Sequence, residues 1–301
     1  MYGLLILNDP SQAVIDIVFV HGLHGGRTKT WTKDDVLWPE ELLPGDVPSA
    51  RILTYGYDAN VAHFWSRPAD NKIDTFSNAF FSQLTNNRSE VDATNRPIIF
   101  VAHSLGGIVV ANAIVDAATN SYGELSSCIR GIIFLGTPHK GSNKAKWADQ
   151  ARKFMTFFKS TNSELLKDLD EKSEKLAKIG DSFPTLLINR GKQSDTRIEI
   201  VCFYEGQPTV SGMIVDEDSA TLPGYDKILL DANHSEMCKF ASSTDSMYRQ
   251  VVGYLIKWVK DFSKPIERQK EGGRNAYFHG TNYGLQQYSN TGTQTNNFGV
   301  R

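Results

Sequence analysis

The clearest indication of the fold comes from residues 98–110, which read IIFVAHSLGGIVV. The first five residues are apolar and predict a strand buried on both faces, and the apolar residues that follow the glycines predict a helix. Only a tight turn fits between them, with Ser104 at its centre. In such a turn the positions two before and two after the serine nearly touch, so both must be small; here they are Ala102 and Gly106. The stretch therefore predicts a nucleophile elbow in which alanine replaces the usual first glycine.

This turn gives Ser104 the setting that a nucleophile needs. The strained turn holds the hydroxyl clear of the backbone, and Gly107 begins the predicted helix, which runs to Ala118. Developing negative charge is favoured at the N-terminus of a helix. Ser104 is therefore the candidate nucleophile.

A second glycine-rich turn lies upstream, in residues 18–26, VFVHGLHGG. A strand that ends in such a loop can aim backbone N–H groups at an acyl oxygen. We therefore predict an oxyanion hole made by the amides of Leu23, which follows Gly22, and of Leu105. No carboxylate lies near the histidines of this loop in the sequence, so we expect no metal site there. Acyl transfer to a serine needs no organic cofactor, and we expect none.

The general base is predicted from position along the chain. In enzymes with this kind of elbow, the order is serine, then an acidic residue, then histidine. His234 follows a late strand at residues 227–230 and is the only histidine between His139 and His279. It is the expected general base.

The acidic residue is harder to select. Glu205 directly follows the predicted strand 198–204 and is itself followed by turn residues. At such a strand end its carboxylate could orient the His234 imidazole. Asp216 and Asp218, and also Asp226, lie between this strand and His234. Glu205 is the preferred candidate, and these aspartates stay open as alternatives.

Short apolar runs alternate with longer helical patterns, which predicts a doubly wound, mainly parallel α/β sheet. The expected strands are Leu4–Leu7, Ile15–Val20, Ala50–Thr54, Ile98–Ala102, Gly131–Leu135, Ile198–Tyr204 and Lys227–Leu230. The expected helices are Asp74–Thr85, Gly107–Ala118 and Asp245–Phe262.

Residues 143–189 are too long for a simple connection. Trp147, Ala151, Phe154 and Phe158 recur at steps of four, three and four, which predicts an amphipathic helical insertion. Either the insertion packs on the sheet, or it forms a lid whose aromatic face meets acyl chains.

The composition limits the class of protein. The chain has 301 residues, 32 basic against 34 acidic residues and a formal net charge of -2, so we expect no nucleic-acid partner. Its three cysteines are odd in number and lack metal-site spacing, which favours reduced thiols and a cytoplasmic location. There is no signal-peptide pattern and no apolar run of the roughly 18 residues needed for a membrane span.

The end of the chain has a different composition. We divide the chain into a hydrolase domain at 1–264, a linker at 265–274 and a tail at 275–301, which has no charged residue before Arg301. Within the tail, Asn282-Tyr283-Gly284 recurs approximately as Asn297-Phe298-Gly299. The tail is expected either to be a disordered spacer or to form amyloid, because uncharged Asn and aromatic positions can stack in register.

Several longer motifs resemble a known family. The runs VFVHGLHGG, WPEELLP, ARILTYGYDA, VAHSLGGIVVANAI, GIIFLGTPHKGS, FYE and ANHSEMCKF are similar to fungal SesB-type α/β-hydrolases, relatives of the SERAC-like and PGAP-like lipases and esterases. This resemblance implies an α/β-hydrolase fold and a serine lipase or esterase that acts on a lipid or acyl ester. It places the family's serine, oxyanion and histidine motifs on Ser104, His21-Gly22-Leu23 and His234, and its FYE motif on Phe203-Tyr204-Glu205.

The tail resembles the short prion-like motifs of the HET-s-related kind. This resemblance implies self-assembly, activation by a NOD-like receptor through amyloid templating, and a role in fungal incompatibility and programmed cell death, with peripheral membrane contact on activation. Two alternatives are a non-catalytic signalling module with a hydrolase fold, and a small-ester or thioester hydrolase with a flexible tail.

Overall fold

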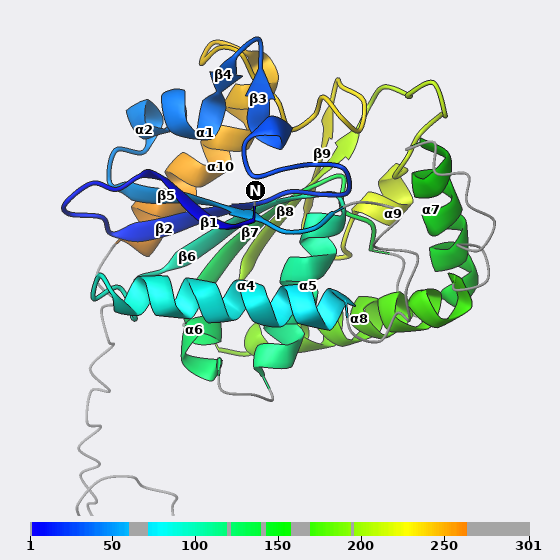
Figure 1. Cartoon of the computed structure of the whole chain (residues 1–301), viewed down its shortest axis with the longest axis horizontal. Coiled ribbons are helices and arrows are strands. Elements are labelled where there is room, and N and C mark those ends of the chain that lie inside the picture. Colours follow the sequence, from blue (N-terminus) through cyan, green and yellow to red (C-terminus); the bar gives the residue numbers. More distant parts are fainter. Residues whose placement is uncertain are drawn as a thin grey trace, which may run out of the picture. The chain divides into compact units, whose positions relative to one another are not determined.

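Seven strands form the central sheet, in the order β1-β5-β2-β6-β7-β8-β9 (Figure 1). The computed structural model describes residues 2–59, 72–118, 122–139, 143–157, 169–193 and 196–263. All neighbouring strands are parallel except β1 and β5, which pair antiparallel. All seven expected strands are confirmed: β1 Gly3–Asn8, β2 Ile15–Val20, β5 Ala50–Gly56, β6 Ile98–His103, β7 Ile129–Leu135, β8 Glu199–Glu205 and β9 Asp226–Leu230.

The three expected helices are confirmed as α4 Lys72–Ser89, α5 Leu105–Ala117 and α10 Ser246–Phe262. Helix α5 begins two residues earlier than predicted, because Ser104 is its N-cap and the chain turns directly from β6 into the helix. The remaining elements are the short helices α1 Trp38–Glu41, α2 Leu43–Asp46, α6 Gly123–Ser127 and α9 Glu217–Ala220, the 3₁₀ helix Lys29–Trp31, and the hairpin of β3 Thr32–Lys33 with β4 Val36–Leu37.

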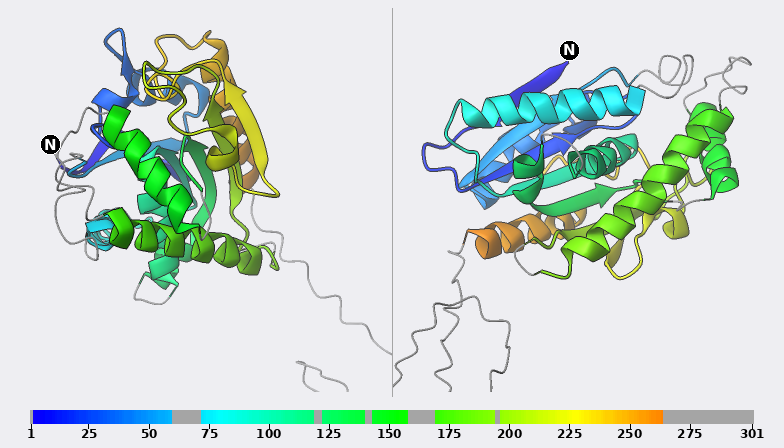
Figure 2. Two further views of the ribbon diagram at one scale, coloured as in Figure 1. Left: turned by 90° about the vertical axis from the view of Figure 1, so that its right-hand side faces the viewer. Right: turned by 90° about the horizontal axis from the view of Figure 1, so that it is seen from below.

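Helices cover both faces of the sheet. Helices α4, α5 and α8 (Leu169–Arg190) lie on one face of the sheet, and α10 lies on the other face with α1 and α2 (Figures 1 and 2). Along β2, Val18 and Val20 belong to the core under the first group, whereas Ile17 and Phe19 belong to the core under the second. Successive residues of a strand point to opposite faces, so a strand buried on both sides is mostly apolar, and Asp16 is the one charged residue of β2.

The insertion forms two helices, α7 Lys144–Phe157 and α8 Leu169–Arg190. Helix α8 packs on α5 and buries Leu176, Phe183 and Leu187 in the core. Helix α7 packs on α8 and lies beyond the carboxyl ends of the strands (Figure 2). The prediction that the insertion packs on the rest of the fold is confirmed for α8, which joins the helical layer. The lid stays a prediction; α7 comes near the candidate site described below.

A buried ion cluster lies at the amino end of β2. The Asp16 carboxylate is fully buried, is bound by the Arg88 guanidinium, and receives a second hydrogen bond from Arg96 at 3.0 Å. Arg88 also donates to the carbonyls of Thr94 and Arg96. The cluster thus joins the end of α4 and the loop before β6 to the central strands.

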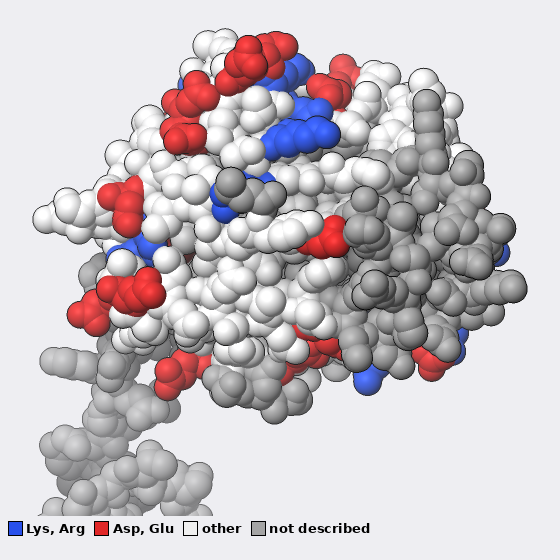
Figure 3. Space-filling view, in the orientation of Figure 1, with Lys and Arg blue, Asp and Glu red and all other residues white. Residues whose placement is uncertain are grey.

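Contacts divide the chain into the units Met1–Pro265 and Ile266–Arg301. The proposed amyloid motif, at residues 282–284 and 297–299, lies outside the described residues. In the ranges given above, no helix is long and apolar enough to cross a membrane. On the face seen in Figure 3, acidic and basic side chains are interspersed among uncharged ones.

Candidate active site

Ser104 occupies a strained turn between β6 and α5, with φ 55° and ψ -127°. Two glycines let other segments reach it. A Cβ atom on Gly22 would lie 2.6 Å from the Ser104 Cβ, and one on Gly106 would lie 2.4 Å from the Val20 carbonyl oxygen. Gly107 packs equally closely against Thr137. A non-glycine residue at positive φ is costly and is often found where function requires it.

Three buried side chains form a chain of contacts at this turn. His234 Nε2 lies 2.9 Å from Ser104 Oγ, and His234 Nδ1 lies 3.4 Å from Glu205 Oε1. Glu205 is the last residue of β8, and His234 lies in the loop after β9. Both therefore lie at the same carboxyl edge of the parallel sheet at which β6 ends before Ser104. The structure therefore brings together the three residues that the sequence singled out.

Glu205 is held by the loop that follows its strand. Its Oε1 accepts a hydrogen bond from the Val215 amide, and its Oε2 accepts none from the described residues. Asp216 instead caps α9, accepting from the Ser219 amide at 3.0 Å, and Asp218 is an exposed residue 3.6 Å from Lys146 Nζ. Of the candidate acids, Glu205 is the one in contact with His234.

The two predicted oxyanion donors lie on either side of the nucleophile. Leu105 is the first residue of α5, and Leu23 follows Gly22, whose backbone touches Ser104. Within the described ranges neither amide donates a hydrogen bond. Leu105 and the loop that carries Leu23 thus both lie next to Ser104, and the role of their N–H groups as oxyanion donors stays a prediction.

His21 fixes the loop that carries Leu23. Its Nδ1 donates to the Gly22 carbonyl at 2.9 Å, and its Nε2 accepts from the Tyr57 amide at 3.3 Å. Its ring also stacks on Tyr57, with ring centroids 4.6 Å apart. Burial lowers the pKa of His21 to about 4, so the imidazole stays neutral near pH 7. Tyr57 was not among the predicted site residues, because its contact with His21 arises only when β5, which it follows, pairs with β2 in the fold.

His103 supports the histidine loop. Its Nε2 donates to the His234 carbonyl at 2.8 Å. Burial, and then the nearby His234, lower the pKa of His103 to about 3. Among the described residues, no group of three or more His, Cys, Asp or Glu side chains could hold a metal ion.

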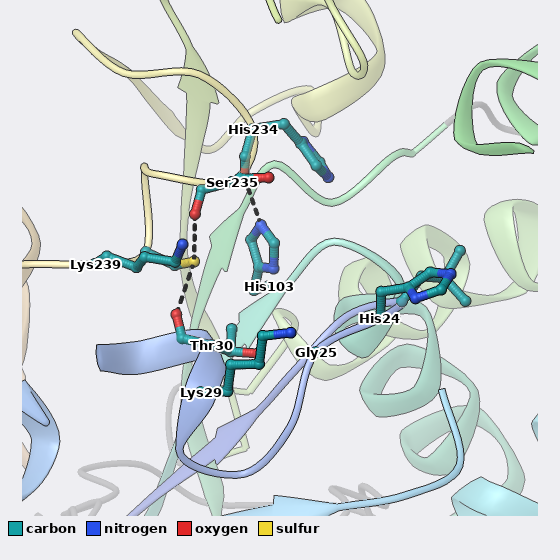
Figure 4. A pocket seen from close by; sticks show the side chains of 10 residues that line it. His24, Gly25, Lys29, Thr30, His103, His234, Ser235 and Lys239 are labelled. Carbon is teal, nitrogen blue, oxygen red and sulfur yellow. Dashed lines mark hydrogen bonds between the residues drawn. The ribbon is translucent and has the colours of Figure 1, made fainter. Parts of the chain in front are cut away.

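A cavity of about 210 Å³ lies between the loop after β2 and the loop that carries His234 (Figure 4). No Asp or Glu is among the described residues that line it, while two lysines are. Lys239 also pairs with Glu236 at 2.9 Å, outside the cavity lining. The lining residues are Leu23, His24, Gly25, Lys29, Thr30, His103, His234, Ser235, Cys238 and Lys239.

Helix α7 contributes an aromatic wall on another side of His234. The rings of Phe154 and Phe157 lie 5.8 and 6.2 Å from the imidazole, measured between centroids. The helix is anchored to the segment after β8, because Gln150 Nε2 donates to the Ile214 carbonyl at 2.8 Å and Lys153 pairs with Asp216 at 3.3 Å. The predicted aromatic Phe158 lies outside the described residues.

Comparisons with known proteins identify the family of this chain. The family model described as "Putative serine esterase (DUF676)" matches residues 11–179, which include the oxyanion loop and the elbow. Protein SERAC1 of Danio rerio is 31% identical over 275 residues, covering 82% of this chain and 39% of the relative. Protein SERAC1 of Homo sapiens is 27% identical over 266 residues, covering 80% and 38%. The chain thus spans about two fifths of the length of these curated relatives.

A solved structure supports the fold. Bacillus licheniformis lipase BlEst2 in mature form aligns with a TM-score of 0.51 and 15% identity, over 84% of this chain and 97% of that structure. Similarity at this level of identity shows a common fold and leaves the activity to be argued from the site. The chain therefore belongs to the family described as "Putative serine esterase (DUF676)" and has the α/β-hydrolase fold.

Proposed function

We propose that the protein hydrolyses acyl esters through Ser104, with His234 as general base and Glu205 as the orienting acid. The observation that carries this proposal is the buried contact chain from Ser104 Oγ through His234 to Glu205 at a strained elbow. The family and the fold support it.

In the proposed reaction, Ser104 Oγ attacks the ester carbonyl while His234 Nε2 takes the hydroxyl proton. The tetrahedral oxyanion accepts hydrogen bonds from the amides of Leu23 and Leu105, and the loss of one such donor typically costs ~2.7 to 4 kcal/mol of transition-state stabilisation. The bond to the leaving oxygen then breaks, and His234 returns the proton to that oxygen. Water, deprotonated by the same histidine, releases the acid and restores Ser104.

The surroundings of His234 favour an ester with an apolar acyl group. The aromatic rings of α7 can contact hydrocarbon, whereas the cavity with Lys29 and Lys239 offers polar contacts to the other part of the substrate. We therefore propose a lipid or other acyl ester as substrate. No step of this mechanism uses a metal or an organic cofactor.

The direct test is an assay over a panel of acyl esters and thioesters of increasing chain length, with wild type and Ser104→Ala. We expect wild type to hydrolyse at least one medium- or long-chain ester, and Ser104→Ala to lose that activity. A wild type that is inert on the whole panel would contradict the proposal and favour the non-catalytic module. A Ser104→Ala variant as active as wild type would contradict the assignment of Ser104 as nucleophile.

We further propose that the tail controls when the enzyme acts. An uncharged Asn-aromatic-Gly repeat suits stacking in a cross-β fibril, and its resemblance to prion-like motifs suggests templating by a matching segment of a NOD-like receptor. On this proposal the protein is a cytoplasmic cell-death effector of fungal incompatibility that is recruited to membranes when the tail assembles.

The tail proposal is tested with the full chain and a matched variant. Tyr283→Lys with Phe298→Lys introduces charges that repel one another in a stacked fibril. We expect the unmodified chain to form fibrils that bind thioflavin T and seed fresh protein, and the double variant to stay monomeric. Full-length protein that remains monomeric for days at high concentration would contradict the proposal while leaving the esterase unaffected.

A further inference from the structure

One peptide group beside the candidate acid is hydrogen-bonded at both ends. It joins Ile214 to Val215. Its carbonyl oxygen accepts from Gln150 Nε2 at 2.8 Å, and its N–H donates to Glu205 Oε1. Gln150, Ile214, Val215 and Glu205 are each at most 1% exposed, so water does not compete for these bonds.

Gln150 is costly to bury, and this makes its presence informative. It lies on the inner face of α7 among apolar residues, and its Oε1 has no hydrogen-bond partner among the described residues. An amide group buried with an unpaired oxygen costs about 1 to 3 kcal/mol. An apolar side chain would cost less free energy to bury at this position, unless the hydrogen bond that the Gln150 amide donates is needed.

Helix α7 is linked to both His234 and Glu205. Phe154 is one helical turn further along, on the same face of α7, and its ring packs 5.8 Å from His234. The same helix thus contacts His234 through Phe154 and reaches Glu205 through Gln150 and a single peptide group.

A donor on the carbonyl of a peptide polarises its N–H and strengthens the bond that this N–H makes. It also fixes the orientation of the peptide plane. Both effects act on the Val215 amide, which is the described hydrogen-bond donor to the Glu205 carboxylate.

We propose that Gln150 is a positioning residue for catalysis. It holds the Ile214–Val215 peptide so that the Val215 N–H keeps Glu205 against His234, in a relay that runs from α7 to Ser104. The relay rests on the proposed esterase function, because it acts only if Glu205 orients a catalytic histidine. It also makes the alignment of the acid depend on where α7 sits.

The test removes the donor while keeping the shape of the side chain. In Gln150→Met, we expect kcat to fall roughly 10-fold to 100-fold while KM changes less than about twofold, since the residue acts on the transition state and not on substrate binding. Gln150→Leu, which also lacks the amide hydrogens, should behave alike if Gln150→Met fails to fold. Arg152→Met, at an exposed position of the same helix, is the matched control and should leave kcat within about twofold.

A double-mutant cycle separates positioning from simple support of the fold. If Gln150 acts through Glu205, replacing it in a Glu205→Gln background should lower kcat by less than about twofold further. An equal loss in both backgrounds, or a single variant as active as wild type, would overturn the relay. If wild type shows no activity that depends on Ser104, the proposed function fails and the relay with it; with that activity present, these outcomes refute the relay alone.

Discussion

At the scale of single residues, the candidate site depends on how closely backbone segments approach Ser104. Gly22 and Gly106 have no room for a Cβ atom, and Ser104 itself has a positive φ. Ala102 stands where the usual elbow has glycine; it is fully buried within β6 and paired with Val20 and Phe134. The turn at Ser104 thus forms with a methyl group at this position.

The identity of the acid gives the sharpest prediction at this scale. We expect Glu205→Gln to lower kcat by about 10² to 10⁴-fold, because a neutral amide cannot stabilise the imidazolium that forms when His234 accepts a proton. Asp216→Asn makes the same change from carboxylate to amide eleven residues further along the chain and should keep kcat within about threefold. Steady-state kinetics on one ester decide between them, and a reversed pattern would assign the acid to Asp216.

At the scale of elements, the sequence predicted the strands and main helices because their apolar runs are long and unbroken. Residues 143–189 were predicted as helical from the spacing of Trp147, Ala151 and Phe154, and they form α7 and α8. The sequence could not show which face of α7 meets His234, since that depends on how the two helices turn back over the sheet edge.

Polar contacts between distant elements were also beyond prediction. Asp16 meets Arg88 across 72 residues, and Gln150 meets Ile214 across 64. Nothing in the local pattern distinguishes these side chains from surface residues. By contrast, Ser104, His234 and Glu205 could be named in advance because each follows a predicted strand whose end lies at one edge of a parallel sheet.

The buried cluster of Asp16 predicts a large loss of stability. Arg88→Met leaves this carboxylate without its main partner, and breaking a buried pair from one side costs about 3 to 5 kcal/mol. Arg197→Met, which removes an exposed pair with Glu199, should cost less than about 1 kcal/mol. Urea unfolding measures both losses of stability. Equal urea midpoints for the two variants would show that the buried cluster contributes no more to stability than the exposed pair.

The aromatic wall of α7 predicts a change in chain-length preference. Phe157→Ala removes a ring that lies against His234, so we expect kcat/KM to fall roughly 10-fold for esters of long acyl chains and less than about threefold for acetate esters. The ratio of the two substrates on one enzyme preparation cancels any loss of folded protein. An unchanged ratio would remove α7 from the acyl-binding surface.

At the scale of the whole molecule, buried neutral histidines make stability depend on pH. Burial lowers the pKa values of His21 to about 4 and of His103 and His139 to about 3, from the ordinary 6.5. At pH values between these lowered pKa values and 6.5, the unfolded chain binds more protons than the folded one. The contribution of these histidines to the free energy of unfolding is therefore fully present above pH 6.5 and is lost as the pH is lowered toward 4 and then 3.

Each such histidine contributes a slope of about 1.4 kcal/mol per pH unit in this range. His139→Phe removes one of them without altering the site contacts, so the decline in unfolding free energy between pH 6 and 5 should become shallower by about that amount. Denaturant titrations at the two pH values provide the measurement. Parallel declines in wild type and variant would mean that His139 is protonated alike in both states.

The central claim is that Ser104 is an activated nucleophile. A fluorophosphonate probe followed by peptide mass spectrometry tests it most directly, because the probe reacts with activated serines and the adduct identifies the residue. We predict one adduct, on Ser104, that is lost in Ser104→Ala and strongly slowed in His234→Ala. Folded wild-type protein that remains unlabelled, or that is labelled on another serine, would contradict the account.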